Sequence, residues 1–326
     1  MVHPIWQDFP EISTALIRVR EIMLSEVKIT SPDIRQKIQE YILAPGKFMR
    51  SGLCLLFDQI HHDTIQEDSY YLAAAIEMLH LATLIHDDVI DQSDTRRGVQ
   101  TLHTSHDNRL AIYAGDYLLI SAGRLMGKTN RFDKENPAFD WAVQGILNGE
   151  ILQLSNQHNL NMNLRTYLKQ IRGKTALLFA LATYVGYYDR QVSKRQNKQA
   201  FYIGEQIGMI FQLSDDVIDY QSSQQESGKP QFQDVRNGIY TAPLLYAMDQ
   251  RPALKSWLQD KQTDFTSEDI DMIHETLEET QAMEACQQLI EAYHQKIRKR
   301  LDRLPGYSHH RAEVLKILDL LDRRKS

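Results

Sequence analysis

The sequence predicts an all-α protein built as one large helical domain that spans residues 1–326. Proline is absent between Pro45 and Pro137 and again between Pro137 and Pro230, which leaves two uninterrupted runs of about ninety residues each. Both runs are rich in Ala, Leu, Ile and Gln, which favour helices. No segment shows the alternation of apolar and polar residues that is typical of strands. Long helices are therefore the expected elements.

Apolar residues that recur at steps of three and four predict the helices to within a few residues. The expected ranges are 10–27, 32–43, 47–61, 67–92, 105–128, 137–156, 163–188, 194–221, 236–250, 266–278, 281–303 and 309–323. Residues 92–104 and 222–235 are polar and are expected to form loops. Because no linker, composition shift or short repeat divides the chain, a single domain is the simplest organisation.

The composition excludes several classes of function. A hydrophobic content of 42% with 9% aromatic residues is sufficient for a large core. The net charge of −6, from 37 basic and 43 acidic residues, gives no reason to expect nucleic-acid binding. Cys54 and Cys286 lie in apolar periodic segments, so we expect reduced core thiols and neither a disulfide framework nor a cysteine-based zinc site. Residues 1–11 lack a signal-peptide pattern, and the uncharged stretch 175–188 is too short to span a bilayer. A cytoplasmic protein is expected.

An acidic motif ends the helical pattern of residues 67–92. Residues 87–91 read Asp-Asp-Val-Ile-Asp, the first pentad. Asp87 and Asp91 are four positions apart, so they share a helix face with Cβ atoms about 5–6 Å apart. Two like charges at the negative end of a helix dipole are unfavourable for stability alone. Mg²⁺ prefers such carboxylate oxygens, and Arg96 and Arg97, which follow, suit phosphate oxygens.

The same five residues recur at 215–219, the second pentad, again at the end of a helical pattern. A polar loop with a basic residue, Lys229, follows. One acidic cluster near basic residues is common on a solvated surface, but two identical clusters in the same context are difficult to explain that way. We expect the two helices to face each other and to bind metal ions that a ligand with several phosphates bridges.

The ordered set of motifs resembles the trans-prenyl diphosphate synthases, which elongate isoprenoid chains head to tail. The resemblance covers residues from about 40 to 250. It is carried by Gly46-Lys47-Phe48-Met49-Arg50, Glu77, His80, the first pentad, Arg96-Arg97-Gly98, Thr101, Ala114-Gly115-Asp116-Tyr117-Leu118, Lys174-Thr175-Ala176, Phe211-Gln212, the second pentad, Gly228-Lys229-Pro230 and Asp234, with the basic tail Arg323-Arg324-Lys325. Two positions depart from the family pattern, because Phe48 stands for Arg and Ser51 for Pro.

The resemblance implies an isoprenoid-synthase bundle with a central active-site cavity, and a reaction in which an allylic diphosphate ionises and isopentenyl diphosphate attacks the cation. It implies two or three Mg²⁺ ions bridged by the substrate diphosphate. The implied metal ligands are Asp87, Asp91 and Asp215, with Asp88, Asp216 and Asp219 in orienting roles. The implied substrate-binding residues are Arg96, Lys174 and Lys229 for the allylic diphosphate, Thr175 and Gln212 beside the cation, and Lys47, Arg50, His80 and Arg97 for isopentenyl diphosphate. Lys174, Thr175 and Gln212 would act closest to the chemistry.

Other classes of protein share part of this pattern. A terpene cyclase would lack the isopentenyl diphosphate residues, and a di-iron bundle would need a second Glu-x-x-His pair beside Glu77 and His80. A non-catalytic regulatory subunit would be expected to lose one pentad. A short-chain farnesyl or geranylgeranyl diphosphate synthase is the main alternative within the family. The pairs His61-His62 and His309-His310 lack carboxylate context, and we assign them no role.

The product is expected to be a medium or long all-trans chain of about six to eight isoprene units, one unit being close to the rise of one helical turn. Ala82 and Thr83, one turn before Asp87, are small, as are Ser121 and Ala122 on the next helix. A quinone side chain is the expected use of the product. The resemblance further implies a homodimer, or a heterodimer with a small subunit, with at most transient membrane contact for product release.

Overall fold

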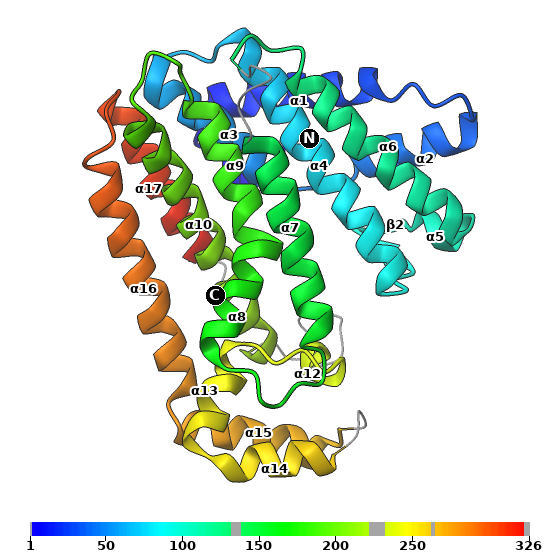
Figure 1. Cartoon of the computed structure of the whole chain (residues 1–326), viewed down its shortest axis with the longest axis vertical. Coiled ribbons are helices and arrows are strands. Elements are labelled where there is room, and N and C mark those ends of the chain that lie inside the picture. The colour runs from blue at the N-terminus through cyan, green and yellow to red at the C-terminus, as the bar shows by residue number, and fades with distance from the viewer. Residues whose placement is uncertain (1, 132–137, 222–231, 262–264, 323–326) are drawn as a thin grey trace. The chain divides into compact units, whose positions relative to one another are not determined.

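The computed structural model describes residues 2–131, 138–221, 232–261 and 265–322. Its helices are α1 (Pro10–Glu26), α2 (Pro32–Leu43), α3 (Met49–His62), α4 (Glu67–Ile90), α5 (Leu102–Ser105), α6 (Asn108–Met126), α7 (Ala138–Ser155), α8 (Leu164–Ile171), α9 (Leu177–Tyr187), α10 (Lys194–Gln221), α12 (Gln233–Arg236), α13 (Ala242–Gln250), α14 (Pro252–Asp260), α15 (Ser267–Glu279), α16 (Ala282–Leu301) and α17 (Ser308–Asp322). A short 3₁₀ turn, η1 (Pro4–Trp6), precedes them. The all-α expectation is confirmed (Figure 1).

Several local features differ from the sequence-based expectation, and one is that the helix expected over 236–250 begins only at Ala242, after the separate short helix α12. The helix expected over 163–188 is divided by η2 (Arg172–Ala176), a stretch of π-helix between α8 and α9. The loop expected over 92–104 contains a two-stranded antiparallel hairpin of β1 (Thr95–Arg96) and β2 (Val99–Gln100). Helix α14 was missed, because its single turn of buried residues, Leu254 and Leu258, is too short for a periodic signal.

The chain forms two compact units. The first contains residues 1–139, 178–202 and 304–317, and the second contains 140–177, 203–303 and 318–326. That these units make one domain stays a prediction. In the first unit α4 packs along α6 and also against α1 and α3, as Figure 1 shows for α4 and α6. In the second unit α13 packs against α8, α14, α15 and α16. The first pentad lies in the first unit and the second pentad in the second.

Helix α4 begins with an acidic first turn and is mostly apolar through its centre. Its central residues from Leu72 to Leu79 are all buried, which explains why the helix persists without side-chain caps. Gln92 follows the C-terminal residue Asp91 with φ of 51°, the left-handed conformation that commonly terminates helices. The chain therefore leaves α4 directly after the first pentad, which places its carboxylates at a helix end.

Both cysteines are buried and unpaired by disulfides, as expected. Within the residues described above, no helix combines the length and the apolar character that a bilayer crossing requires.

Candidate active site

The first pentad ends α4 with its carboxylates directed to different environments. Asp87 is half-buried and Asp91 is exposed, whereas Asp88 is buried at 1% exposure. Thr83 and His80, one and two turns earlier, are also half-buried, so they share the accessible face of the helix with Asp87. This face presents two carboxylates and keeps the third in the interior.

Asp88 is held in the interior by two hydrogen-bond donors. Arg96 donates to Oδ1 from Nε at 2.7 Å and lies 2.6 Å away through Nη2. The Tyr41 hydroxyl donates to Oδ2 at 3.2 Å and accepts from the backbone N–H of Leu102 at 3.1 Å. Burial raises the pKa of Asp88, and the hydrogen bond from Arg96 is the strongest influence in the opposite direction. Asp88 therefore serves to anchor Arg96.

The β1–β2 hairpin explains how Arg96 and Arg97 reach different neighbours. Arg97 and Gly98 have φ of 52° and 77°, which is the backbone of a type I′ turn between two strands. Arg96 reaches Asp88 from β1, whereas the Arg97 guanidinium lies against Gly46. A Cβ atom at Gly46 would lie 2.6 Å from Nη1 of Arg97. The structure thus brings Arg97 to the segment that contains Lys47.

Arg50 and His80 are also brought together, from α3 and α4. Nη1 of Arg50 donates to Nε2 of His80 at 3.2 Å, and the Arg50 guanidinium lies 4.4 Å from the ring centre of Phe179. Burial lowers the pKa of His80 well below its usual value, and Arg50, Arg97 and Arg96 lower it further. His80 is therefore a neutral acceptor that orients Arg50. Its neighbourhood is cationic, which suits a diphosphate.

The two departures from the family pattern have local explanations. Phe48 is buried at 6% exposure, and the Arg20 guanidinium from α1 lies 4.8 Å from its ring centre. The Phe48 ring therefore makes a cation–π contact with a guanidinium from another helix. Ser51 is fully buried and donates from Oγ to Glu77 Oε2 at 2.5 Å. Ser51 thus donates a hydrogen bond to a buried carboxylate, which the side chain of proline could not do.

The second pentad repeats the burial pattern of the first within the second unit. Asp215 and Asp219 are half-buried, and Asp216 is buried at 3% exposure. The Tyr167 hydroxyl donates to Oδ2 of Asp216, and Gln212 Nε2 donates to Oδ1 at 2.7 Å. Burial raises the pKa of Asp216 to about 7, against these two hydrogen bonds. In both pentads the second aspartate is thus anchored by a phenol and one further donor.

A hydrogen-bond chain links Asp216 to the residues expected beside the cation. Gln212 Oε1 accepts from Thr175 Oγ1 at 2.7 Å, so Thr175, Gln212, Asp216 and Tyr167 form one connected series. Thr175 is buried at 5% exposure. The amide of Gln212 is fixed by its donor and acceptor, so its carbonyl direction is defined.

Lys174 and Thr175 lie on the π-helical stretch η2. One turn of π-helix inserts an extra residue and re-aims the side chains around it, which is why such turns are frequent at functional sites. Gly149 of α7 lies directly against it, since a Cβ atom there would overlap the Lys174 nitrogen and lie 2.6 Å from the carbonyl carbon of Gly173. Lys174 Nζ meets Glu150 Oε2 at 3.1 Å. Close backbone contact therefore sets the position of Lys174.

Each predicted site residue except Lys229 has a described position, and Lys229 lies outside the described residues. The first unit holds Lys47, Arg50, His80, Asp87, Asp91, Arg96 and Arg97, and the second holds Lys174, Thr175, Gln212 and Asp215. That the two pentads face each other stays a prediction. Sequence analysis missed Arg20, Tyr41, Tyr167 and Glu150, because none of them lies in a motif and only the fold brings them to the site residues.

Comparison with known proteins gives the same assignment. The family model described as Polyprenyl synthetase matches residues 32–294. The chain belongs to this family. It is a prenyltransferase, and members of the family generally depend on Mg²⁺. The match favours this class over a terpene cyclase or a di-iron protein.

Three relatives illustrate the similarity. Heptaprenyl diphosphate synthase component 2 of Bacillus subtilis is 36% identical over 282 residues, which cover 86% of this chain and 80% of the relative. The crystal structure of heptaprenyl diphosphate synthase from Staphylococcus aureus has a TM-score of 0.87 at 28% identity and covers 97% of this chain and 99% of its own. Geranylgeranyl pyrophosphate synthase of Lactobacillus brevis has a TM-score of 0.86 at 31% identity, with 98% of each chain covered. Enzymes named for products of different lengths thus share this backbone.

Asp87→Asn should reduce turnover at least about 100-fold, because it removes a charged oxygen from the accessible end of α4 while conserving shape. Steady-state rates at saturating Mg²⁺ would measure the loss, with circular dichroism as a check on folding. Asp94→Asn is the matched control, since Asp94 is exposed and lies three residues beyond the pentad. Near-normal turnover of the Asp87 variant would rule out the metal assignment.

Gly149→Ala should displace the backbone at Gly173 and Lys174, because the added methyl group has no room, and overpacking of this kind costs about 1–3 kcal/mol. We expect a higher KM for the allylic substrate and a lower kcat. Gly123→Ala is the control, since its Cβ atom would lie 3.7 Å from Phe139, an ordinary contact. Equal kinetics for the two variants would show that the close contact does not position Lys174.

Proposed function

We propose that this prenyltransferase catalyses Mg²⁺-dependent head-to-tail condensation of isopentenyl diphosphate with an allylic diphosphate to give a medium or long all-trans polyprenyl diphosphate. The observation that carries the proposal is the repeated pentad. In both copies the first and fifth aspartates are half-buried or exposed, and the second is buried and anchored by hydrogen bonds. A purely structural acidic cluster would have no reason to repeat this division between accessible and anchored carboxylates.

Asp87, Asp91 and Asp215 are the proposed metal ligands, and their hard oxygen donors fit Mg²⁺. Two or three ions, bridged by the substrate diphosphate, would stabilise the charge that develops on the leaving group. Asp88 and Asp216 hold Arg96 and Gln212 in place and so act indirectly. We assign Asp219 the same orienting role.

The cations divide between the two substrates. Lys47, Arg50 and Arg97 bind isopentenyl diphosphate, with His80 as the neutral acceptor that directs Arg50. Arg96, Lys174 and Lys229 bind the allylic diphosphate. Arg96 is supported by its anchoring on Asp88, and Lys174 by the close packing of its backbone. The assignment of Lys229 to this substrate depends on the sequence alone.

Thr175 and Gln212 are proposed to face the allylic cation with their oxygen dipoles. The double bond of isopentenyl diphosphate attacks the cation, the carbon–oxygen bond to diphosphate having broken, and a proton is then lost. No side chain with the required basicity stands out among the described site residues, and the released diphosphate is the proposed acceptor of that proton.

Turnover with labelled isopentenyl diphosphate tests the proposal directly. We expect incorporation of label into organic-soluble chains that requires both an allylic primer and Mg²⁺ and stops when EDTA is added. Release of a cyclic hydrocarbon from the allylic diphosphate without consumption of isopentenyl diphosphate would instead identify a terpene cyclase.

Small residues below the first pentad support a long product. Thr83 lies one turn before Asp87 on the accessible face of α4, whereas the neighbouring Ala82 is buried at 2% exposure within the first unit. Ser121 and Ala122 on α6 are fully buried and small as well. Thr83 is therefore the better position for a barrier, since an enlarged side chain there need not displace the core. The name of the Bacillus subtilis relative supports a product near seven units for this chain.

Thr83→Phe should shorten the product to about three units while the first condensation stays fast, because the ring would block the chain one helical turn, about 5.4 Å, from the first aspartate. Product lengths resolved by reversed-phase thin-layer chromatography would show the change. Thr83→Val is the matched control, since it conserves size and removes only the hydroxyl group. Wild-type length from the Phe variant would mean that the growing chain does not pass this face.

We also propose that the chain works with a second subunit. Helix α6 carries exposed apolar residues Ile112, Tyr113 and Ile120, of which Tyr113 and Ile120 are 71% and 67% exposed and share one face. Clustered exposure of this kind is typical of an interface. The relative from Bacillus subtilis is named component 2, which favours a small dissimilar partner over an identical chain. We further propose that the enzyme is cytoplasmic and contacts the membrane only transiently to release its product. The product would serve as the side chain of a quinone.

Ile120→Lys should weaken subunit association, because it places a charge in the apolar surface of α6. Light scattering of the purified chain, alone and with a candidate small subunit, would report the change in mass. Ile17→Lys is the control, because Ile17 is 52% exposed on α1. A fully active wild-type monomer would refute the proposal.

A further inference from the structure

The C-terminal end of α3 carries two adjacent histidines that the proposed reaction does not use. The sequence alone gives His61-His62 no carboxylate context, and the structure shows that this expectation is wrong. The loop after α9 brings Asp189 to them, so that Asp189 Oδ2 lies 3.2 Å from Nε2 of His61 and 3.8 Å from Nε2 of His62. The three side chains are 21–29% exposed, and their candidate ligand atoms all lie within 4.8 Å of one another.

These distances are close to those of a metal site. Three ligand atoms bound to Zn²⁺ at 2.0–2.1 Å in a tetrahedron lie about 3.3 Å apart. The two separations from Asp189, 3.2 Å and 3.8 Å, are near this value, and the separation of the two imidazole nitrogens is at most 4.8 Å. Two imidazoles and one carboxylate form a donor set that suits transition metals and leaves a fourth position for water.

A second layer of hydrogen bonds orients two of the three ligands. His62 Nδ1 lies 2.9 Å from Asp58 Oδ1 and 3.4 Å from Arg131 Nη2, and with its ring proton on Nδ1, donated to the shorter contact, His62 has its lone pair on Nε2, which faces Asp189. Asp58 is fully buried and also accepts from Arg131 Nη2 at 2.7 Å and from the backbone N–H of Gln66 at 2.6 Å. A histidine that binds a metal ion is usually oriented in this way, by a carboxylate that accepts a hydrogen bond from its other ring nitrogen.

Asp189 is oriented as well. The backbone N–H of Gln191 donates to Oδ1 at 2.7 Å, so Oδ2 is left to face the two imidazoles. The Asp189 carboxylate is therefore held with one oxygen directed at both imidazoles, which is the support that a metal-ligating side chain needs.

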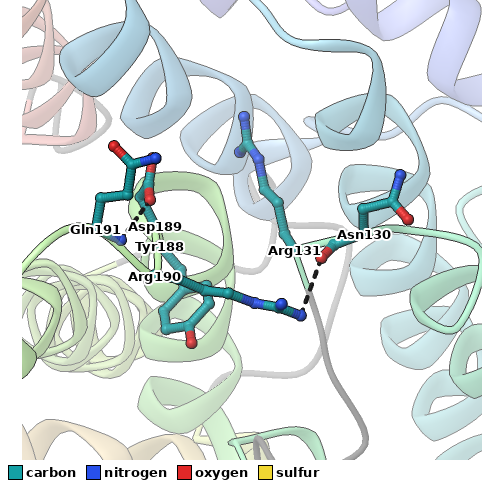
Figure 2. Close-up of a pocket in the computed structure, with 6 residues that line it drawn as sticks. All are labelled: Asn130, Arg131, Tyr188, Asp189, Arg190 and Gln191. Carbon is teal, nitrogen blue, oxygen red and sulfur yellow. Dashed lines mark hydrogen bonds between the residues drawn. The ribbon is translucent and has the colours of Figure 1, made fainter.

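The charge and access at the site suit a cation. The positive charge of Arg131 is offset by Asp58, and Asp189 adds one negative charge. Asp189 also lines a surface pocket of about 230 Å³ with residues 130, 131, 188, 190 and 191. Figure 2 shows the Arg190 side chain extending toward Asn130, whose carbonyl it meets at 3.2 Å, and away from the Asp189 carboxylate. The Asp189 side chain is 29% exposed, so solvent reaches it.

We propose that His61, His62 and Asp189 form a binding site for a divalent transition-metal ion of the Zn²⁺ type. His61 would carry its ring proton on Nδ1 in the bound form. The ion would join the end of α3 to the segment after α9, positions 128 residues apart in the sequence, within the first unit. Its consequence is stabilisation of that unit, separate from the Mg²⁺ ions of the reaction.

A neighbouring cluster of similar composition provides an internal comparison. Asp63 lies near His309 and His310, but both ring nitrogens of His310 face oxygen acceptors, Nδ1 at 2.8 Å from Glu313 and Nε2 at 3.2 Å from the Asp63 carbonyl. His310 therefore has no lone pair directed at a metal. The His309 side chain is 63% exposed and Asp63 45% exposed, so this cluster is also less ordered for binding.

Zn²⁺ titration of the tag-free, chelator-treated full chain tests the proposal, with millimolar Mg²⁺ present to occupy the oxygen-rich pentads. We expect one Zn²⁺ per chain by calorimetry and elemental analysis, and a rise in Tm of about 3 °C or more at saturation. Co²⁺ in its place should give the visible absorption of a tetrahedral site.

His61→Ala and Asp189→Asn should each weaken Zn²⁺ binding at least about 100-fold. His309→Ala and Asp87→Asn should retain it, since they alter the comparison cluster and the first pentad. Absence of Zn²⁺ binding by the wild type, retention by Asp189→Asn, or loss in Asp87→Asn alone would overturn the proposal. If His61→Ala does not fold, Asp189→Asn tests the site instead, because asparagine conserves the shape of aspartate. The Co²⁺ spectrum is recorded on the wild-type chain and needs no variant. None of these readouts depends on prenyl transfer.

Discussion

Repulsion between carboxylates at helix ends is the constraint on which the site depends. Each pentad places three aspartates within two turns, where the helix dipole disfavours them. The fold reduces the repulsion by burying the second aspartate and giving it hydrogen-bond donors, one of them the charged Arg96. Arg96 and Tyr41 hold Asp88, and Gln212 and Tyr167 hold Asp216. In the proposed function the remaining carboxylates bind metal ions, which would offset the repulsion between them.

The hydrogen bonds that hold Asp88 and Asp216 also position the cationic and polar side chains that donate them. Arg96 directly precedes the type I′ turn of Arg97 and Gly98, and its hydrogen bond to Asp88 joins this hairpin to the end of α4. In the second unit the π-helical turn η2 directs Thr175 to Gln212, and Gln212 then bonds Asp216. Backbone irregularities occur where side chains need defined directions, which is a common use of π-helical turns and tight hairpins.

The sequence predicted the helices, the acidic motifs and most of the basic residues because these depend on spacing along the chain. Periodicity gave α4 and its aspartates, and the repeated pentad distinguished a site from a charged surface. It did not predict Tyr41 or Tyr167, since each is an ordinary buried tyrosine until the fold places a carboxylate beside it. The π-helical turn at Arg172–Ala176 was not predicted, because one extra residue in a turn leaves no signal in a helical pattern that continues on both sides. Asp189 was not linked to the α3 histidines, because 128 residues separate them in the sequence.

The central claim is that the pentads hold substrate only through metal ions. Titration calorimetry with a non-ionising allylic thiodiphosphate measures this without turnover. The account predicts binding at least about 100-fold tighter in Mg²⁺ than in EDTA, because uncompensated carboxylates repel a diphosphate. Equal affinity in both conditions would contradict it, and would mean that the basic side chains alone bind the substrate.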